Sequence, residues 1–317
     1  MSEGTAVRTV QTASAAGEDS LGQRKSVATL RPEASAADRH TTFRVLWYGG
    51  NILLILAIIS AAYSGVWEYS TRRYLRGFSD AIVPESSSPE QKVEAILQWI
   101  SHGPARQEAN SLAPGPDRDP TDTLNYASLL RVCGTATNAF VNLADSAGLA
   151  ARRLLLLDSH RMTKHVVAEV LVDGRWVVVD PAFRAVFRGP DGQLLTREQL
   201  ANPAVLAAAT RGIAGYDPAY TFDRTAHVRI ARLRVIGVSI RSILDHALPG
   251  WEDSVAMSLM LERESLATLV IALALVVLLG LLRVGLRWYG ESRLGVRPVR
   301  FRQQVRRAFH AFVDTAG

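Results

Sequence analysis

The chain has 317 residues, a formal net charge of +6 and one cysteine, Cys133. A single cysteine excludes an intrachain disulfide, so the thiol is either reactive or a small buried side chain. The positive charge gathers near the C-terminus, where eight arginines and two acidic residues follow residue 282, whereas residues 67–265 carry 22 basic and 23 acidic side chains. The overall basic balance therefore gives no indication of nucleic-acid binding, and we expect no nucleic-acid partner.

The N-terminal part of the chain combines a polar tail with an apolar stretch. Residues 1–44 are rich in Ala, Ser, Thr and Gly without an apolar period, which predicts a disordered tail. Residues 45–66 contain no charged side chain, which is typical of a membrane-spanning helix. The long tail before this span, without a clear small-x-small cleavage site, favours an uncleaved anchor over a signal peptide. Residues 67–88 are expected to form a linker.

A second apolar stretch, residues 266–286, predicts another transmembrane helix, with Arg283 reaching toward the membrane surface. The arginine-rich tail 287–317 marks the cytoplasmic side of the membrane. Two spans place both termini on the same side. We therefore expect a two-pass protein of the bacterial inner membrane, in contact with the lipid bilayer, whose termini are cytoplasmic and whose central domain is periplasmic.

The central domain begins with two predicted helices. Ser88-Pro-Glu-Gln91 is typical of a capping box with proline at the first helical position. Apolar residues recur at three- and four-residue spacing over 134–147, and Gly148 is a natural helix stop. Cys133 would begin this second helix. There the positive end of the helix dipole favours a thiolate, and the backbone N–H groups can bind an oxyanion.

A β-hairpin is predicted at Asp173-Gly174, because this dipeptide fits a type I′ turn between two strands. The valine-rich runs that flank it are residues 165–172 and 175–180. In the register set by a two-residue turn, His165 and Asp180 become diagonal neighbours on one face, within side-chain reach. The carboxylate of Asp180 could then orient the imidazole of His165. Glu169 shares this face and either contacts the site or is a solvated strand residue.

These patterns together resemble the transglutaminase-like superfamily. The resemblance covers about residues 89–183 and places the catalytic core at residues 89–185. It rests on the helix-opening cysteine, the His-x-x-x-Glu-Val run from His165 and the Asp-Gly-x-Trp-x-x-x-Asp-Pro run from Asp173. Papain-like enzymes share the residue order, but they separate cysteine and histidine by roughly 130 positions or more. The resemblance implies an α+β fold with a papain-like core, in which a helix packs on an antiparallel sheet. Here two transmembrane helices would flank that core.

The same resemblance assigns roles to individual residues. Cys133 would be the nucleophile, His165 the general base and later the acid, and Asp180 the residue that holds the imidazole. Tyr126 lies upstream of the cysteine, where related enzymes often place an oxyanion donor, and it is either such a donor or a core residue. The sequence has no His-Glu-x-x-His, no paired cysteines and no Walker-type loop, so we expect no metal and no cofactor.

The predicted function is that of a membrane-anchored extracytoplasmic cysteine hydrolase, a peptidase or amidase that forms a thioester with a peptide, protein or other amide or ester substrate. Transamidation is one alternative. Another is a non-catalytic partner of envelope-assembly proteins, for example in polysaccharide assembly. Residues 186–265 are expected to extend the catalytic core. Within them, Val228 to Leu248 would form an amphipathic helix that either lies on the membrane or packs on the domain.

Overall fold

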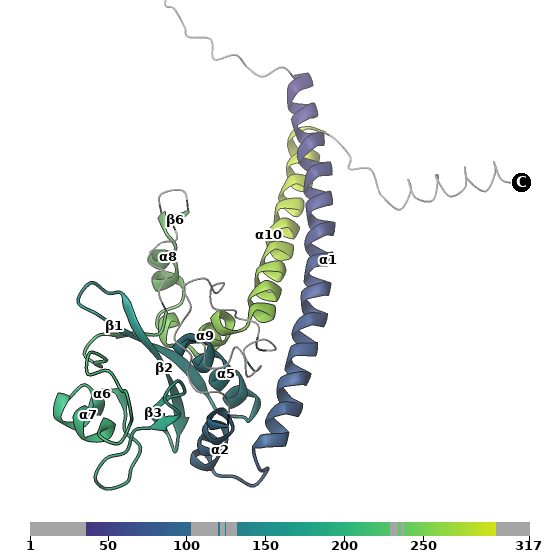
Figure 1. Cartoon of the computed structure of the whole chain (residues 1–317). Helices are drawn as coiled ribbons and strands as arrows, with labels where there is room; N and C mark the ends of the chain where they lie inside the picture. The colour runs from purple at the N-terminus through teal and green to yellow at the C-terminus, as the bar shows by residue number, and fades with distance from the viewer. Residues whose placement is uncertain are drawn as a thin grey trace, which may run out of the picture.

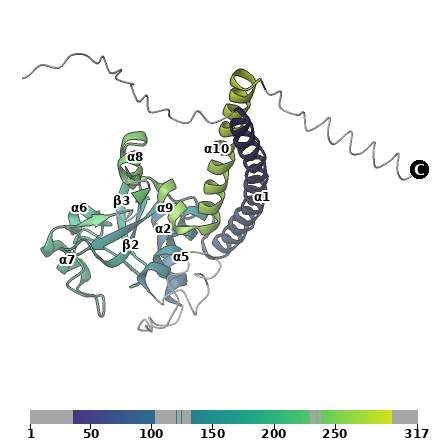
Figure 2. The same cartoon turned by 90° about the horizontal axis from the view of Figure 1, so that it is seen from above.

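Two long helices lie side by side, and the remaining described elements gather at one end of the pair (Figure 1). α1 spans Ala36–Ile82 and α10 spans Glu264–Arg293. Figure 2 shows the same adjacency after a 90° turn. The computed structural model describes residues 36–102, 120, 124, 132–228, 234–235 and 238–295.

Both long helices are apolar and long enough to cross a membrane. Their large apolar side chains face outward instead of filling a protein core. On α1, Leu53 is 55% exposed and Ile59 60%, and on α10, Val277 is 62% exposed and Leu281 65%. Soluble proteins rarely expose so much contiguous apolar surface, so these helices favour a membrane protein.

α1 is longer than the span predicted at residues 45–66. It begins inside the predicted disordered tail and continues through most of the stretch 67–88, which was expected to be a linker. The last turns of α1 belong to the domain, because Leu75 is fully buried and the Phe78 ring packs edge-on against Trp99 at 4.9 Å. These contacts keep residues 67–82 helical. The tails 1–35 and 296–317 lie outside the described residues.

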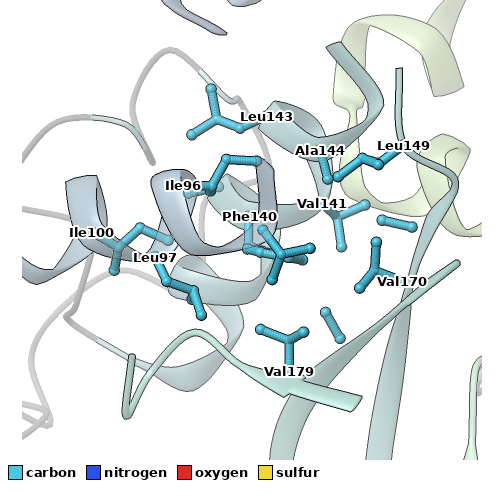
Figure 3. Close-up of a cluster of buried hydrophobic side chains, with 14 of the residues drawn as sticks. Ile96, Leu97, Ile100, Phe140, Val141, Leu143, Ala144, Leu149, Val170 and Val179 are labelled. Atoms are coloured by element: carbon cyan, nitrogen blue, oxygen red, sulfur yellow. The ribbon is translucent and has the colours of Figure 1, made fainter. Parts of the chain in front are cut away.

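Two helices form the core of the domain with the sheet. α2, Pro89–Ser101, begins with the predicted capping box, in which Ser88 and Gln91 each accept a hydrogen bond from the other's backbone N–H. α5 spans Cys133–Ser146 and is followed by the predicted stop Gly148, whose φ of +79° suits glycine. Apolar side chains from both helices meet those of the sheet in one buried cluster (Figure 3), with Ile96, Leu97, Ile100, Phe140, Val141, Leu143, Val170 and Val179 among them.

Within the described residues, an antiparallel sheet of five strands has the order β4-β3-β2-β1-β5. The strands are β1 Ala151–Leu157, β2 Thr163–Val172, β3 Arg175–Asp180, β4 Ala185–Val186 and β5 Thr225–Ala226. The predicted hairpin is confirmed. Asp173 and Gly174 form its turn with φ of 49° and 78°, and Val172 pairs with Arg175 in the expected register.

The opposite face of the sheet is covered by the C-terminal extension. Its short helices are α6, Arg197–Leu200, and α7, Pro203–Thr210. A second buried apolar cluster lies beneath this extension and includes Leu154, Val167, Val178, Phe187, Leu195, Leu200 and Phe222. The two faces of the sheet are therefore both buried.

The amphipathic helix predicted from Val228 to Leu248 is wrong as a single element. Strands β6, Arg234–Val235, and β7, Val238–Ser239, pair as a short ladder, and α8 covers Ile240–Ala247. The spacing of apolar residues that suggested a helix is also compatible with strands as short as β6 and β7, which explains why a single helix was predicted. The 3-10 helix η1, Trp251–Asp253, and α9, Val255–Glu262, then lead into α10.

Candidate active site

Cys133 is the first residue of α5, as its sequence context predicted. The preceding Val132 is extended, with φ −142° and ψ 159°. Thr135 fixes this helix start, since both its backbone N–H (3.1 Å) and its hydroxyl (2.8 Å) donate to the carbonyl oxygen of Val132. Cys133 packs against Leu155, Leu157 and Val166, and the residue is partly exposed.

His165 and Asp180 are hydrogen-bonded, with 2.7 Å between Nε2 of the imidazole and Oδ2 of the carboxylate. Both side chains are fully buried. The other carboxylate oxygen, Oδ1, accepts the backbone N–H groups of Ala182 at 3.1 Å and Phe183 at 3.2 Å. The tight turn after β3 thus holds the carboxylate in place, and the carboxylate orients the ring.

The second ring nitrogen of His165, Nδ1, is not engaged by Asp180. Nδ1 is buried and has no hydrogen bond of ordinary geometry to a described residue. Burial alone would lower the pKa of His165, but interactions with the Asp180 carboxylate and the Cys133 thiol outweigh it and raise that pKa to about 9. A protonated imidazole beside a thiolate is the arrangement that these interactions stabilise.

Three aromatic rings surround the imidazole. Tyr220 stacks on it, with centroids 4.3 Å apart and an interplanar angle of 6°. Phe183 and Tyr216 meet it edge to face at 5.7 Å and 6.4 Å. Burial, the negative charge of Asp180 and the neighbouring Tyr220 raise the pKa of Tyr216. The tyrosine rings exclude water from the hydrogen bond between His165 and Asp180.

The structure brings three of the predicted site residues together: Cys133, His165 and Asp180. Tyr126, the candidate oxyanion donor, lies outside the described residues. Tyr216 and Tyr220 were not predicted from the sequence, because they belong to the extension and follow no strand or helix period. Their spacing of four residues on either side of Asp217-Pro218 is the sole local sign of a turn that pairs two aromatic rings.

Glu169 is neither solvated nor part of this site. Its carboxylate is buried and accepts hydrogen bonds from Arg152 at 2.9 Å and His227 at 2.7 Å, and His227 also bonds Asp253 at 2.7 Å. Burial would raise the pKa of Glu169, but the bond from His227 and the charge of Arg152 lower it. This second cluster connects β2 to the 3-10 helix η1, which precedes α9. Across the described part of the chain, no group of His, Cys, Asp and Glu is placed to hold a metal ion.

Residues 76–181 match the family model of the transglutaminase-like superfamily. The matched range contains α2, α5 and the strands β1 to β3, and with them Cys133, His165 and Asp180. The resemblance inferred from the sequence is thereby confirmed, and the chain contains a transglutaminase-like domain. This superfamily includes cysteine hydrolases and transglutaminases, and some of its members are not catalytic. No curated protein and no solved structure matched the chain.

Proposed function

We propose that the chain is a membrane-anchored cysteine hydrolase that cleaves amide or ester bonds outside the cytoplasm. One observation carries this proposal: the bond between Nε2 of His165 and Asp180 leaves Nδ1 of the same ring for the thiol of Cys133. A nucleophile, a base and a residue that orients the base are the parts of a papain-like triad.

In the first half of the reaction, the Cys133 thiolate attacks the substrate carbonyl carbon and forms a C–S bond. The carbonyl oxygen becomes an oxyanion, for which the backbone N–H groups of Cys133 and Gly134 at the start of α5 are suitable donors, because a helix offers its first N–H groups no carbonyl partner. The intermediate collapses and the C–N or C–O bond breaks. His165 transfers its Nδ1 proton to the leaving group, which leaves a thioester on the enzyme.

In the second half, His165 acts as the base. Its neutral Nδ1 takes a proton from a water molecule as the water oxygen attacks the thioester carbon. The C–S bond then breaks, the acid product leaves, and the thiolate and imidazolium form again. Asp180 orients the ring and stabilises the imidazolium in both halves of the reaction.

The exposed apolar surfaces of α1 and α10 support the proposed membrane anchoring. The eight arginines after residue 282 favour a cytoplasmic C-terminus, and the antiparallel course of two spans brings the N-terminus to the same side. The domain with Cys133 then faces the periplasm or the cell exterior. Since Cys133 is the one cysteine of the chain, a membrane-impermeant maleimide added to intact cells tests this location directly. Protection of the thiol until the membrane is opened would contradict it.

An acyl-enzyme test uses the full-length protein in nanodiscs and 4-nitrophenyl acetate. We expect a burst of nitrophenolate close to one equivalent per protein, followed by turnover, because an acyl-enzyme accumulates before hydrolysis. Cys133→Ala and His165→Ala should both abolish the burst. Acyl transfer to an added amine in place of water would assign transamidation.

Matched variants separate a chemical effect from a structural one. His160→Ala removes an exposed histidine five positions upstream and should leave the burst unchanged. Asp180→Asn should slow the burst by about 100-fold or more, since the ring loses its orienting charge, whereas Asp173→Asn in the turn of the same hairpin should not. Equal bursts in His165→Ala and His160→Ala would refute the proposal.

A further inference from the structure

The environment of His165 is completed by residues beyond the matched domain. Phe183 follows the matched range directly, and Tyr216 and Tyr220 come from the extension, in the segment 211–224. The family-matched region alone would leave one face of the imidazole open. The extension therefore contributes directly to the surroundings of the imidazole.

The turn that carries Tyr220 is held by hydrogen bonds within it and by the packing of the next aromatic residue. Tyr220 donates its backbone N–H to the carbonyl of Asp217 at 3.0 Å, and the Asp217 side chain accepts the N–H of Ala219 at 2.8 Å. Downstream, Phe222 is buried against Phe187, with ring centroids 6.0 Å apart. This turn is thus held against the sheet, and the Tyr220 ring has a defined place over the imidazole.

The geometry of Tyr220 differs from that of its neighbours. Its ring lies parallel to the imidazole, whereas Phe183 and Tyr216 approach at steep angles of 68° and 87°. The face of an aromatic ring carries negative electrostatic potential, so a parallel stack favours the protonated imidazole over the neutral one. The stack also prevents rotation of the ring away from Asp180.

We propose that Tyr220 is a positioning residue of the thiol site, which holds the imidazole of His165 in its plane and stabilises the imidazolium through the face of its ring. The extension is then part of the active site and not a separate appendage. This inference rests on the proposed function, since it concerns the base of that reaction. Other titratable groups that face the imidazole are Asp180 from β3, Cys133 from α5 and Tyr216 from the same segment as Tyr220.

The test is the pH dependence of alkylation of Cys133 by iodoacetamide, in the full-length protein in nanodiscs. In a thiolate–imidazolium pair, the rate rises once when the thiolate forms and again when the imidazolium loses its proton. We expect the upper step of the wild type near pH 9 and its absence in His165→Ala. Tyr220→Leu keeps a buried apolar side chain but lacks the ring face, and should move the upper step down by roughly 0.5 to 1.5 pH units.

Two further variants make the outcome decisive. Tyr220→Phe keeps the ring face and should leave the upper step in place. Pentafluorophenylalanine at position 220 keeps the shape of the ring but reverses the charge of its face, and should lower the step at least as far as leucine does. This variant decides the matter if Tyr220→Leu lacks a cooperative thermal transition.

The two proposals fail in different ways. An upper step that stays in place in Tyr220→Leu and in the fluorinated variant, while still depending on His165, would overturn the role of Tyr220 alone. An equal shift in Tyr220→Phe would also overturn it, because the hydroxyl and not the ring face would then be responsible. A wild-type profile that does not depend on His165 would overturn both proposals.

Discussion

Arg263 joins the domain to the two long helices, and its loss should destabilise the protein markedly. The guanidinium is buried at the junction of α9 and α10. It donates to Asn142 Oδ1 and Asp145 Oδ2 of α5, both at 2.9 Å, and to Glu68 Oε1 of α1 at 3.2 Å. Ser265 donates to the other oxygen of Glu68 at 2.7 Å. We consider the substitution Arg263→Met, which keeps the aliphatic volume and removes the charge.

The magnitude follows from the burial of the partners. The side chains of Arg263 and Glu68 are 2% and 5% exposed. Removal of one member of a buried ion pair costs about 3–5 kcal/mol, because the other charge stays buried. Glu68 keeps a bond from Arg72 at 2.6 Å, so we expect the lower end, about 3 kcal/mol. That loss corresponds to a fall of the melting temperature by roughly 6–12 °C for a domain of this size.

The assay is thermal unfolding in nanodiscs, followed by tryptophan fluorescence. Arg72→Met is the matched control, since Arg72 contacts the same carboxylate but is 61% exposed. Because Arg72 is largely solvated and Glu68 keeps its bond from Arg263 in this variant, the pair should contribute only about 0.5 kcal/mol, and the melting temperature should fall by no more than about 2 °C. Equal shifts for the two variants, or a shift under 2 °C for Arg263→Met, would refute the view that a buried charge network joins α1, α5 and α10.

Two further predictions concern the sheet and its hairpin. Glu169→Gln should lower the free energy of unfolding at pH 7 by about 2 kcal/mol, because the charged bonds to Arg152 and His227 are weakened. The folded-state pKa of Glu169 lies below its usual value of 4.5. The difference in the free energy of unfolding between the wild type and Glu169→Gln should therefore be complete above pH 4.5 and be lost as the pH falls through the folded-state pKa. A difference that stays constant down to about pH 3 would contradict this. Gly174→Ala should cost about 1–2 kcal/mol in thermal unfolding, because φ is +78° while no neighbouring atom obstructs a Cβ. Gly77→Ala within α1 should instead stabilise by up to about 1 kcal/mol, and the same sign for both glycines would refute the argument from φ.

Local signals in the sequence were sufficient to place two of the three proposed catalytic side chains relative to each other. The Asp173-Gly174 turn fixes the strand register, and the two-residue period of a strand then puts His165 and Asp180 on one face. The start of the helix at Cys133 could also be predicted, from the apolar period that follows it and from the stop at Gly148. These features depend on neighbours within a few positions of the chain.

The elements around the domain were harder to predict. The stretch 67–82 was expected to belong to a linker, yet it is helical because Leu75 and Phe78 pack on the domain. The pattern from Val228 to Leu248 suggested one helix, but short strands precede α8. In both cases a tertiary contact or a strand pairing outweighs the local preference of the sequence.

The apolar spans, the hairpin and the order of thiol, imidazole and carboxylate could be inferred without coordinates, because each is encoded by residues close together in the chain. The position of Tyr220 on the imidazole depends on the folding of the whole domain, since Tyr220 lies 55 positions from His165 in the sequence. The same is true of the burial of Arg263 between Glu68 and Asp145. Such contacts form when segments distant in the sequence bury their apolar surfaces against each other. The local spacing of apolar residues does not show which segments will meet.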